Sequence, residues 1–217
     1  MPIPTTELVI FDTTQAVRND RSILSPAFKM VSKFNGIQMP AYVGTHIENP
    51  GKGCVFMNWD SLAHHQTMLA SPSYPTLLEA LKPAYGGWSK MYHVIFNAQP
   101  IALKQPVTEV LLLTIKNPSH RTEVFDILTK ISDSTKKMLV FGPALEDKNV
   151  IIVVGGWQSV EVCVEGIAIF GCADAIEFKA HWQMVANPEP KAALERLYTL
   201  ASRDHLFHST LTPFSGK

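Results

Sequence analysis

Four histidines in the first half of the chain are the side chains best suited to acid–base chemistry. His64 and His65 are consecutive, whereas His46 and His93 stand singly in apolar segments. An imidazole titrates near neutral pH, so a histidine that faces an apolar pocket can act as a general base. We therefore predict that the catalytic residues are among His46, His64, His65 and His93. The competing interpretation is that histidines on apolar faces only pack or cap.

A second set of side chains could hold a ligand. Alternate residues of a strand share a face, so Tyr42 is expected beside His46, and Asn97 beside His93. If both faces point inward, they place a small polar group in an apolar pocket, where Tyr42 or Asn97 could stabilise a developing oxyanion. The predicted substrate-binding residues are Tyr42, Phe56, Trp59, Asn97, Trp157, His181 and His208.

The sequence has no pattern typical of metal or phosphate chemistry. Cys54, Cys163 and Cys172 lie in apolar stretches without metal-ligand spacing, where cysteine behaves as a small hydrophobe. A glycine-rich phosphate loop, a nucleophile elbow and an HExxH motif are all missing from the sequence. We therefore predict no metal site and no required cofactor.

The composition indicates which classes of partner the protein is not expected to bind. Lys and Arg number 19, as do Asp and Glu, so no net charge attracts nucleic acid. The N-terminus lacks the basic start and apolar region of a signal peptide, and no run approaches the roughly 18 apolar residues of a membrane span. We expect a cytoplasmic protein, with 46% hydrophobic residues to build its core.

An internal repeat organises the chain. Residues 6–10 (TELVI) are echoed by residues 108–112 (TEVLL), and residues 63–66 (AHHQ) by residues 180–183 (AHWQ). Two matches in the same order predict two copies of one structural unit. The second copy has Trp157 where the first has His46. Since the first copy keeps more titratable groups, we expect it to hold the working site.

The apolar periodicity gives the same element order in each copy. Helical spacing is seen at Leu24, Phe28 and Val31, and again around residues 124–131, where Asn117-Pro118 is a plausible cap. Strand-like runs follow at residues 42–48 and 54–59, and in the second copy at 150–158 and 164–170. A second helix interrupted near its proline and a last strand, at 91–97 and 206–211, complete the unit.

This order, βαββαβ, is the ferredoxin-like unit, so the predicted fold class is α+β with antiparallel sheets. The predicted domains are residues 1–98 and 107–217. Successive residues of 109–115 and 150–154 are apolar on both strand faces, which requires cover on both sides of each sheet. We predict that the two sheets cover each other around an apolar cavity.

These features resemble the dimeric α+β barrel superfamily, in the tandem form of its antibiotic-biosynthesis-monooxygenase-like (ABM-like) and stress-responsive A/B barrel branches. The likeness is carried by residues 58–61 (NWDS), residues 71–74 (SPSY) and His93, within an order that covers nearly the whole chain. The superfamily includes cofactor-free oxygenases, cyclases, lactone isomerases, haem-degrading enzymes and small stress proteins. The resemblance therefore implies a cavity rather than one reaction.

Three functions are consistent with such a cavity. The first is a cofactor-independent oxygenase, cyclase or isomerase that binds a small hydrophobic, aromatic or polyketide-like molecule and removes a proton with a histidine. The second is a non-catalytic binding or stress-response protein. The third is a haem protein, although residues 8–11 lack the asparagine that the haem-degrading branch implies. The resemblance also implies a homodimer as one arrangement. The balanced charge and the lack of a long apolar run predict no nucleic-acid or membrane partner.

Overall fold

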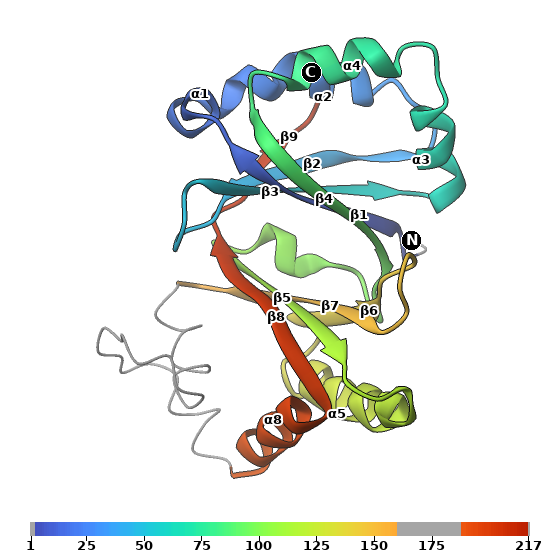
Figure 1. Cartoon of the computed structure of the whole chain (residues 1–217), viewed down its shortest axis with the longest axis vertical. Coiled ribbons are helices and arrows are strands. Elements are labelled where there is room, and N and C mark those ends of the chain that lie inside the picture. Colours follow the sequence, from blue (N-terminus) through green and yellow to red (C-terminus); the bar gives the residue numbers. More distant parts are fainter. Residues whose placement is uncertain (1–2, 160–187, 217) are drawn as a thin grey trace. The chain divides into compact units, whose positions relative to one another are not determined.

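The computed structural model describes residues 3–159 and 188–216. These residues fall into two compact units. The first comprises Met1–Phe96, Ala144–Glu146 and Ser209–Lys217, and the second Asn97–Pro143 and Asp147–His208. Each unit has an antiparallel sheet with helices on one face (Figure 1). The predicted α+β class with two ferredoxin-like repeats is confirmed.

The sheet of the first unit has five strands in the order β4-β1-β3-β2-β9, each antiparallel to its neighbours. Strand β1 lies inside the sheet and pairs with β3 on one side and with β4 on the other. The short strand β9 comes from the far end of the sequence and adds to the edge of β2. The bounds are β1 (Thr5–Thr13), β2 (Ile37–Thr45), β3 (Lys52–Trp59), β4 (Tyr85–Ile95) and β9 (Thr212–Phe214).

The helices of the first unit are short and are punctuated by proline. Pro26 and Pro75 stand in the first turns of α2 and α4, where a missing N–H is tolerated. Helix α3 ends at Leu69, and Pro72 lies in the break before α4, as predicted. The helical segments are α1 (Gln15–Asn19), the 3-10 helix η1 (Arg21–Leu24), α2 (Ser25–Val31), α3 (Leu62–Leu69) and α4 (Tyr74–Leu81).

Strand β1 is buried on both faces, as its apolar pattern predicts. Val9 and Phe11 belong to the hydrophobic core under the helices, together with Phe28 of α2. Leu8 and Ile10 point to the opposite face and are also buried, at 0% and 6% exposure. Residue 7 shares the helix-covered face with Val9, because side chains alternate along a strand. A polar side chain at position 7 therefore lies between the sheet and the helices.

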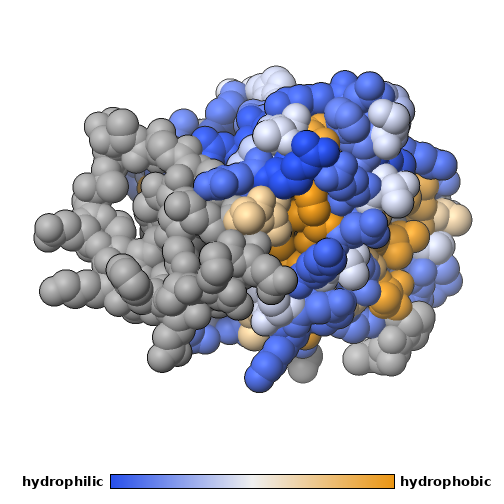
Figure 2. All heavy atoms as spheres, turned by 90° about the horizontal axis from the view of Figure 1, so that it is seen from below, coloured by the Kyte–Doolittle hydropathy of each residue, from blue (hydrophilic) through white to orange (hydrophobic). Residues whose placement is uncertain are grey.

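The second unit has a four-stranded sheet in the order β6-β7-β5-β8. Helix α5 buries Val124, Ile127 and Leu128 against the sheet, at the helical spacing predicted. Asn117 caps the 3-10 helix η3, which directly precedes α5, by accepting a hydrogen bond from the Ser119 N–H. The bounds are η2 (Ile101–Lys104), β5 (Val107–Ile115), η3 (Pro118–His120), α5 (Arg121–Ser134), β6 (Leu139–Pro143), β7 (Val150–Trp157), α8 (Pro188–Leu200) and β8 (Ala201–Ser209). Figure 2 views the molecule from the side of α5 and α8, where hydrophobic residues lie between hydrophilic ones.

The second repeat departs from its predicted strands. The pair expected at 150–158 and 164–170 is formed instead by β6 and β7, so residues 139–143 are a strand that the prediction missed. Residues 164–170, like the helix expected around residues 180–183, lie outside the described residues. The units also differ from the predicted domains 1–98 and 107–217, because Ala144–Glu146 and Ser209–Lys217 pack in the first unit.

None of the helices in the described part of the chain is both long and apolar enough to cross a membrane.

Candidate active site

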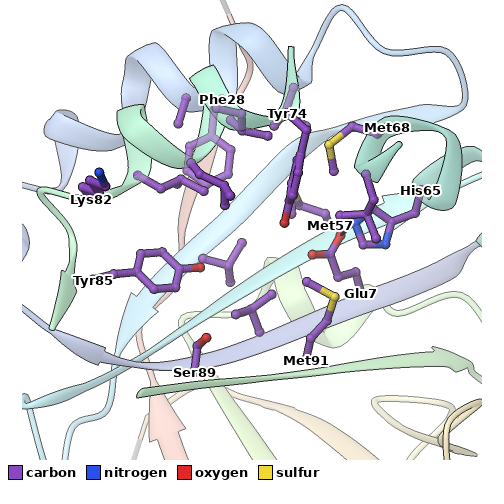
Figure 3. Close-up of a pocket in the computed structure, with 18 residues that line it drawn as sticks. Glu7, Phe28, Met57, His65, Met68, Tyr74, Lys82, Tyr85, Ser89 and Met91 are labelled. Carbon is purple, nitrogen blue, oxygen red and sulfur yellow. Dashed lines mark ion pairs between the residues drawn. The ribbon is translucent and has the colours of Figure 1, made fainter. Parts of the chain in front are cut away.

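A cavity of about 310 Å³ lies between the sheet of the first unit and its helices. This volume is at the lower end of the range for small-molecule pockets, about 300–1,000 Å³. Most of its wall is apolar and comes from α2, α3 and α4 above strands β1, β3 and β4 (Figure 3). Glu7 and His65 contribute polar groups at one end. The cavity is thus a largely apolar pocket, with Glu7 and His65 at one end and Lys82 and Tyr85 at the other.

Glu7 is a buried carboxyl group on β1 that faces this cavity. Its Oε2 accepts a hydrogen bond of 2.9 Å from the indole Nε1–H of Trp59, at the end of β3. Burial raises the pKa of Glu7 from 4.5 to about 7, and the bond from Trp59 opposes part of that rise. Near neutral pH the carboxyl group therefore exists in both protonation states, as a group that exchanges protons requires.

His65 lies directly beside Glu7 and is completely buried. Its ring stacks on the indole of Trp59, with centroids 4.9 Å apart and planes inclined by 26°. The Nε2 atom is 3.4 Å from Glu7 Oε2, too far or too poorly aligned for a hydrogen bond in this arrangement. Burial lowers the pKa of His65 to about 4, helped by the neighbouring His93. The imidazole is therefore neutral at physiological pH.

His93 continues the line of polar groups on β4. It pairs with Glu7 across the sheet, so both side chains emerge on the helix-covered face. Its Nε2 lies 2.6 Å from His65 Nδ1, and its Nδ1 lies 2.5 Å from Glu146 Oε1. The backbone N–H of His93 also donates to the Glu146 carboxylate. We refer to Glu7, His65, His93 and Glu146 as the carboxylate–imidazole chain.

The loop that carries Glu146 is attached to β4 by its backbone as well. The N–H of Leu145 donates to the carbonyl of His93 at 2.8 Å, and Ala144 forms a β-bridge with Val94. This loop follows β6 in the sequence of the second repeat but packs in the first unit. A residue from the second repeat thus completes a polar line that begins in the first.

The proton positions along the carboxylate–imidazole chain follow from Glu146, the hydrogen-bond acceptor at its outer end. An ionised Glu146 accepts only, so His93 Nδ1 carries a proton and the Nε2 of a neutral His93 is an acceptor. His65 Nδ1 then donates to His93, and His65 Nε2 keeps a lone pair directed toward Glu7. The hydrogen-bond network thus favours one tautomer of each imidazole. It makes His65 Nε2 a base beside the cavity.

Glu7, His65 and His93 also have the composition of a metal site, and their donor atoms lie within 4.8 Å of one another. However, His65 turns a different ring nitrogen toward each neighbour, Nε2 toward Glu7 and Nδ1 toward His93. Lone pairs on the two nitrogens of one imidazole diverge, so these directions do not meet at a single ion. The arrangement is linear rather than convergent, which suits proton transfer better than metal binding.

Two phenols supply the remaining polar groups that matter for a ligand. The hydroxyls of Tyr74, from the start of α4, and of Tyr85, from the start of β4, point into the cavity (Figure 3). Burial raises the pKa of both, and the nearby Glu7 raises each further, so both remain neutral donors. Among the described residues no group hydrogen-bonds to either hydroxyl. They are therefore available to a ligand oxygen.

The other predicted residues of the first repeat lie away from this cavity. The Nδ1 of His64 is 3.0 Å from Ser61 Oγ, and its ring packs against Gly36. Tyr42 pairs with Phe56, and Phe56 pairs with Leu8, so these side chains occupy the opposite face of the sheet from His93. The prediction that Tyr42 and His93 share one lumen is wrong for this reason. His46 follows β2, bridges to Ser209 and does not line the cavity.

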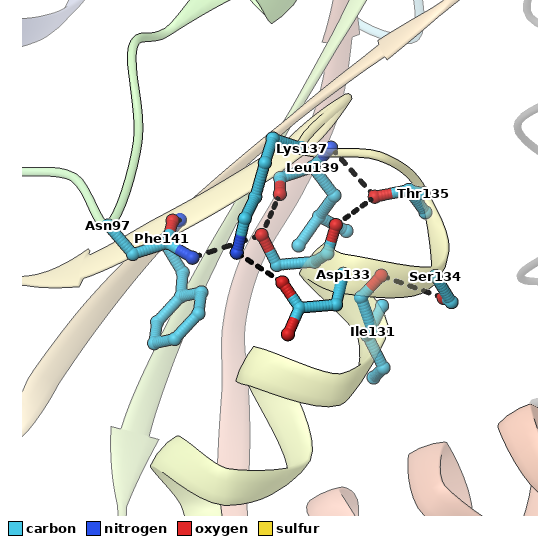
Figure 4. Close-up of polar contacts among 9 residues, drawn as sticks. Asn97, Ile131, Asp133, Ser134, Thr135, Lys137, Leu139 and Phe141 are labelled. Atoms are coloured by element: carbon cyan, nitrogen blue, oxygen red, sulfur yellow. Dashed lines mark hydrogen bonds and ion pairs between the residues drawn. The ribbon is translucent and has the colours of Figure 1, made fainter.

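The residues predicted from the linker and the second repeat belong to the second unit. Asn97 donates its amide to Ser132 Oγ and accepts from the Phe141 N–H, which gives it a structural role beside β6 (Figure 4). Trp157 donates to Glu109 at 2.9 Å, and His208 is buried on β8. Residue 181 lies outside the described residues. Of the predicted set, the structure brings together His65, His93 and Trp59.

Two residues of the carboxylate–imidazole chain were missed by sequence reasoning. Glu7 lies inside the repeated segment 6–10, and its counterpart Glu109 accepts from Trp157 as Glu7 does from Trp59. A charged residue kept at the same place in two apolar strands was the available signal. Glu146 gave no such signal, because it stands beside Asp147 in a polar turn.

Solved structures share this fold across nearly the whole chain. An anthrone oxidase-like protein has a TM-score of 0.67 at 14% identity, covering 99% of this chain and 94% of its own. A "putative monooxygenase" from Lactobacillus acidophilus has a TM-score of 0.60 at 12% identity, with 99% and 97% covered. A mutant chlorite dismutase from Candidatus Nitrospira defluvii, in complex with cyanide, has a TM-score of 0.56 at 10% identity, with 96% and 91% covered.

These identities establish the fold alone. The chain has the fold of these solved structures, with two ferredoxin-like repeats, as the resemblance implied. No protein-family model matches the chain, and neither does any curated protein.

Proposed function

We propose that the first unit is an enzyme that removes a proton from a small hydrophobic, aromatic or polyketide-like molecule without a cofactor. The observation that carries this proposal is the pairing of Glu7 and His65 at one end of a largely apolar cavity. Loss of a proton from an acidic C–H leaves an enolate. Its electron pair can then react with dioxygen, attack a carbonyl or be reprotonated elsewhere, which are the oxygenase, cyclase and isomerase outcomes.

The protonation states at neutral pH fit this role. His65 is neutral, with a pKa of about 4, and its buried Nε2 has no hydrogen-bond partner in the part of the chain that the structure describes. Glu7, with a pKa of about 7, can accept a proton or return one within the same turnover. A base whose pKa is close to the working pH transfers protons most effectively. Glu7 is thus the stronger candidate for the group that first receives the proton, with His65 beside it.

The cavity can also stabilise the negative charge that proton loss creates. Tyr74 and Tyr85 offer neutral hydroxyl donors that have no hydrogen-bond partner within residues 3–159 and 188–216. A carbonyl oxygen placed between them would accept hydrogen bonds that strengthen as the enolate forms. This geometry favours a substrate with a carbonyl group adjacent or conjugated to the acidic C–H. The anthrone named for one structural neighbour has this chemistry, because its ketone acidifies the ring methylene group.

Haem is a weaker candidate for this cavity. His65 Nε2 is the imidazole nitrogen directed at the cavity, and Glu7 Oε2 lies 3.4 Å from it, where an axial iron would have to bind. The second nitrogen of His65 and both nitrogens of His93 are already in hydrogen-bond contact. A hemin titration that gives no Soret band would agree with this reading.

The shared first step of the three reactions provides the test. We expect the protein to accelerate exchange of the anthrone methylene protons with D₂O under nitrogen, followed by ¹H NMR, and to consume oxygen when air is admitted. Glu7→Gln and His65→Phe should each reduce the exchange rate by about 10²–10⁴-fold. Glu109→Gln is the matched control, because Glu109 accepts from an indole in the same way but lies in the second unit.

The result also separates an enzyme from a binding protein. Quenching of tryptophan fluorescence by anthrone without any acceleration of exchange would support a non-catalytic carrier instead. A homodimer and a cytoplasmic location remain expectations, and sedimentation velocity would test the first.

A further inference from the structure

The carboxylate–imidazole chain extends beyond the groups that a substrate could touch. Glu7 and His65 face the cavity, whereas His93 and Glu146 do not line it. Side-chain exposure is 2% for Glu7, 0% for His65, 8% for His93 and 43% for Glu146. The carboxylate–imidazole chain therefore begins at two buried side chains, Glu7 and His65, and ends at a carboxylate in contact with solvent. General-base chemistry at Glu7 and His65 leaves this outward half unexplained.

We infer that His65, His93 and Glu146 form a proton path between the buried Glu7 end of the cavity and water, with Glu146 of the second repeat as its outer terminus. This inference rests on the proposed function, which supplies the proton to be moved. The contacts are short, at 2.6 Å between the imidazoles and 2.5 Å between His93 and Glu146. Proton transfer along a line of donors and acceptors needs contacts of this length.

Each transfer along the path is balanced. The substrate C–H bond breaks and an O–H bond forms at Glu7, while the electron pair stays on the substrate. The Glu7 O–H bond then breaks as an N–H bond forms at His65 Nε2. The Nδ1–H bond of His65 breaks as His93 Nε2–H forms, and His93 Nδ1–H breaks as Glu146 O–H forms. Glu146 then gives its proton to water. Both imidazoles end neutral in the opposite tautomer, and return of a proton by the reverse steps restores them.

The anchoring of Glu146 supports a path rather than a casual surface contact. One oxygen faces the imidazole Nδ1, and both oxygens are within 3.1 Å of the His93 backbone nitrogen. The adjacent Leu145 N–H holds the loop to the same residue of β4. The carboxylate is thus fixed at His93 while its other side remains open to solvent.

The test measures exchange of buried imidazole protons with water and needs no substrate. In protein labelled with ¹⁵N-histidine, the N–H protons of His65 and His93 should exchange through the path. Glu146→Gln keeps an acceptor for His93 but does not carry a proton onward, so we expect exchange to slow at least tenfold. Asp147→Asn makes the same change one residue along the loop, outside the path, and should leave exchange at the wild-type rate.

The direction of the change separates the path from a structural role. Loosening of the loop would admit water and make exchange faster, whereas loss of the path makes it slower. Glu146→Ala should also slow exchange, and added formate should restore it by replacing the missing carboxylate. Wild-type or faster exchange in Glu146→Gln overturns the inference. In that case the proposed function still stands if the wild-type protein turns anthrone over. If exchange slows in Glu146→Gln but the wild-type protein does not turn anthrone over, only the proposed function is overturned.

Discussion

Replacing Glu7 with glutamine should change the pH dependence of the stability of the first unit. Burial raises the pKa of Glu7 from 4.5 to about 7, so the folded state holds this proton more tightly than the unfolded chain does. A rise from 4.5 to about 7, at about 1.4 kcal/mol per unit, corresponds to about 3 kcal/mol. Because Glu7 is buried, solvent screening reduces this figure little.

The sign follows from which state binds the proton. The stabilisation by the bound proton is complete below the unfolded pKa of 4.5 and is lost as the pH rises through about 7. Glutamine is uncharged at every pH and has nearly the shape of the protonated acid. We therefore expect wild type and Glu7→Gln to be similarly stable at pH 4.5, and the variant to be more stable by about 3 kcal/mol at pH 8.

His65 conceals this effect in the wild-type protein. Its pKa falls from 6.5 to about 4 on folding, so its contribution is present above pH 6.5 and is lost as the pH falls toward 4. Between pH 4.5 and 6.5 the slopes from Glu7 and His65 nearly cancel. Removing Glu7 should expose the His65 slope, and Glu7→Gln should lose about 3 kcal/mol between pH 7 and pH 4.

Urea denaturation at pH 4.5, 6 and 8 would measure these differences. Amide resonances of β1 and β3 should be followed, because two units need not unfold together. Glu79→Gln removes an exposed carboxylate from α4 and is the control, with an expected change under about 0.5 kcal/mol. A difference between wild type and Glu7→Gln that stays constant from pH 4.5 to pH 8 would refute the reasoning.

Three further substitutions test individual contacts, and a fourth, Gly87→Ala, is the control for one of them. Trp59→Phe removes the donor to Glu7 and should raise the Glu7 pKa above about 7, and a ¹³C-carboxyl titration showing an unchanged or lower value would contradict this. Gly36→Ala should lower the free energy of unfolding by about 2 kcal/mol or more, because φ is +80° and the new Cβ would lie 2.2 Å from His64 Cγ. Gly87→Ala, with φ of +136° and nothing within 4 Å, should cost less in the same urea experiment, and equal costs would exclude the clash. Tyr85→Phe should leave stability within about 1 kcal/mol but weaken anthrone binding about tenfold. Calorimetry that finds equal affinities would show that the hydroxyl is not used.

The fold could be predicted because its evidence is local and occurs twice. Echoed segments and apolar periodicity are enough to place β1 and β5 and the helices α2 and α5. Strand β6 was missed because it is only five residues long and ends in Gly142-Pro143, which reads as a turn. Short strands defined by their partners give little signal of their own.

The site was only partly predictable, since its contacts join distant residues. The sequence singles out His65 and His93 by residue type, but two-sided burial leaves open which face of β4 is covered by helices. Glu7 is 52 residues from Trp59, and Glu146 is 53 residues from His93. The role of each carboxylate depends on residues that are near it only in the folded protein, and apolar periodicity does not reveal such contacts.

Strand β9 and the loop 144–146 follow the first repeat in the sequence but pack in the first unit. This arrangement determines how the polypeptide could be cut into two fragments. A polypeptide severed within residues 99–106 would leave an N-terminal fragment whose β2 edge has lost its β9 partner. That fragment would also lack the acid that holds His93. The duplicated halves are therefore no longer interchangeable modules, and reconstitution from two co-expressed fragments should succeed where either fragment alone fails.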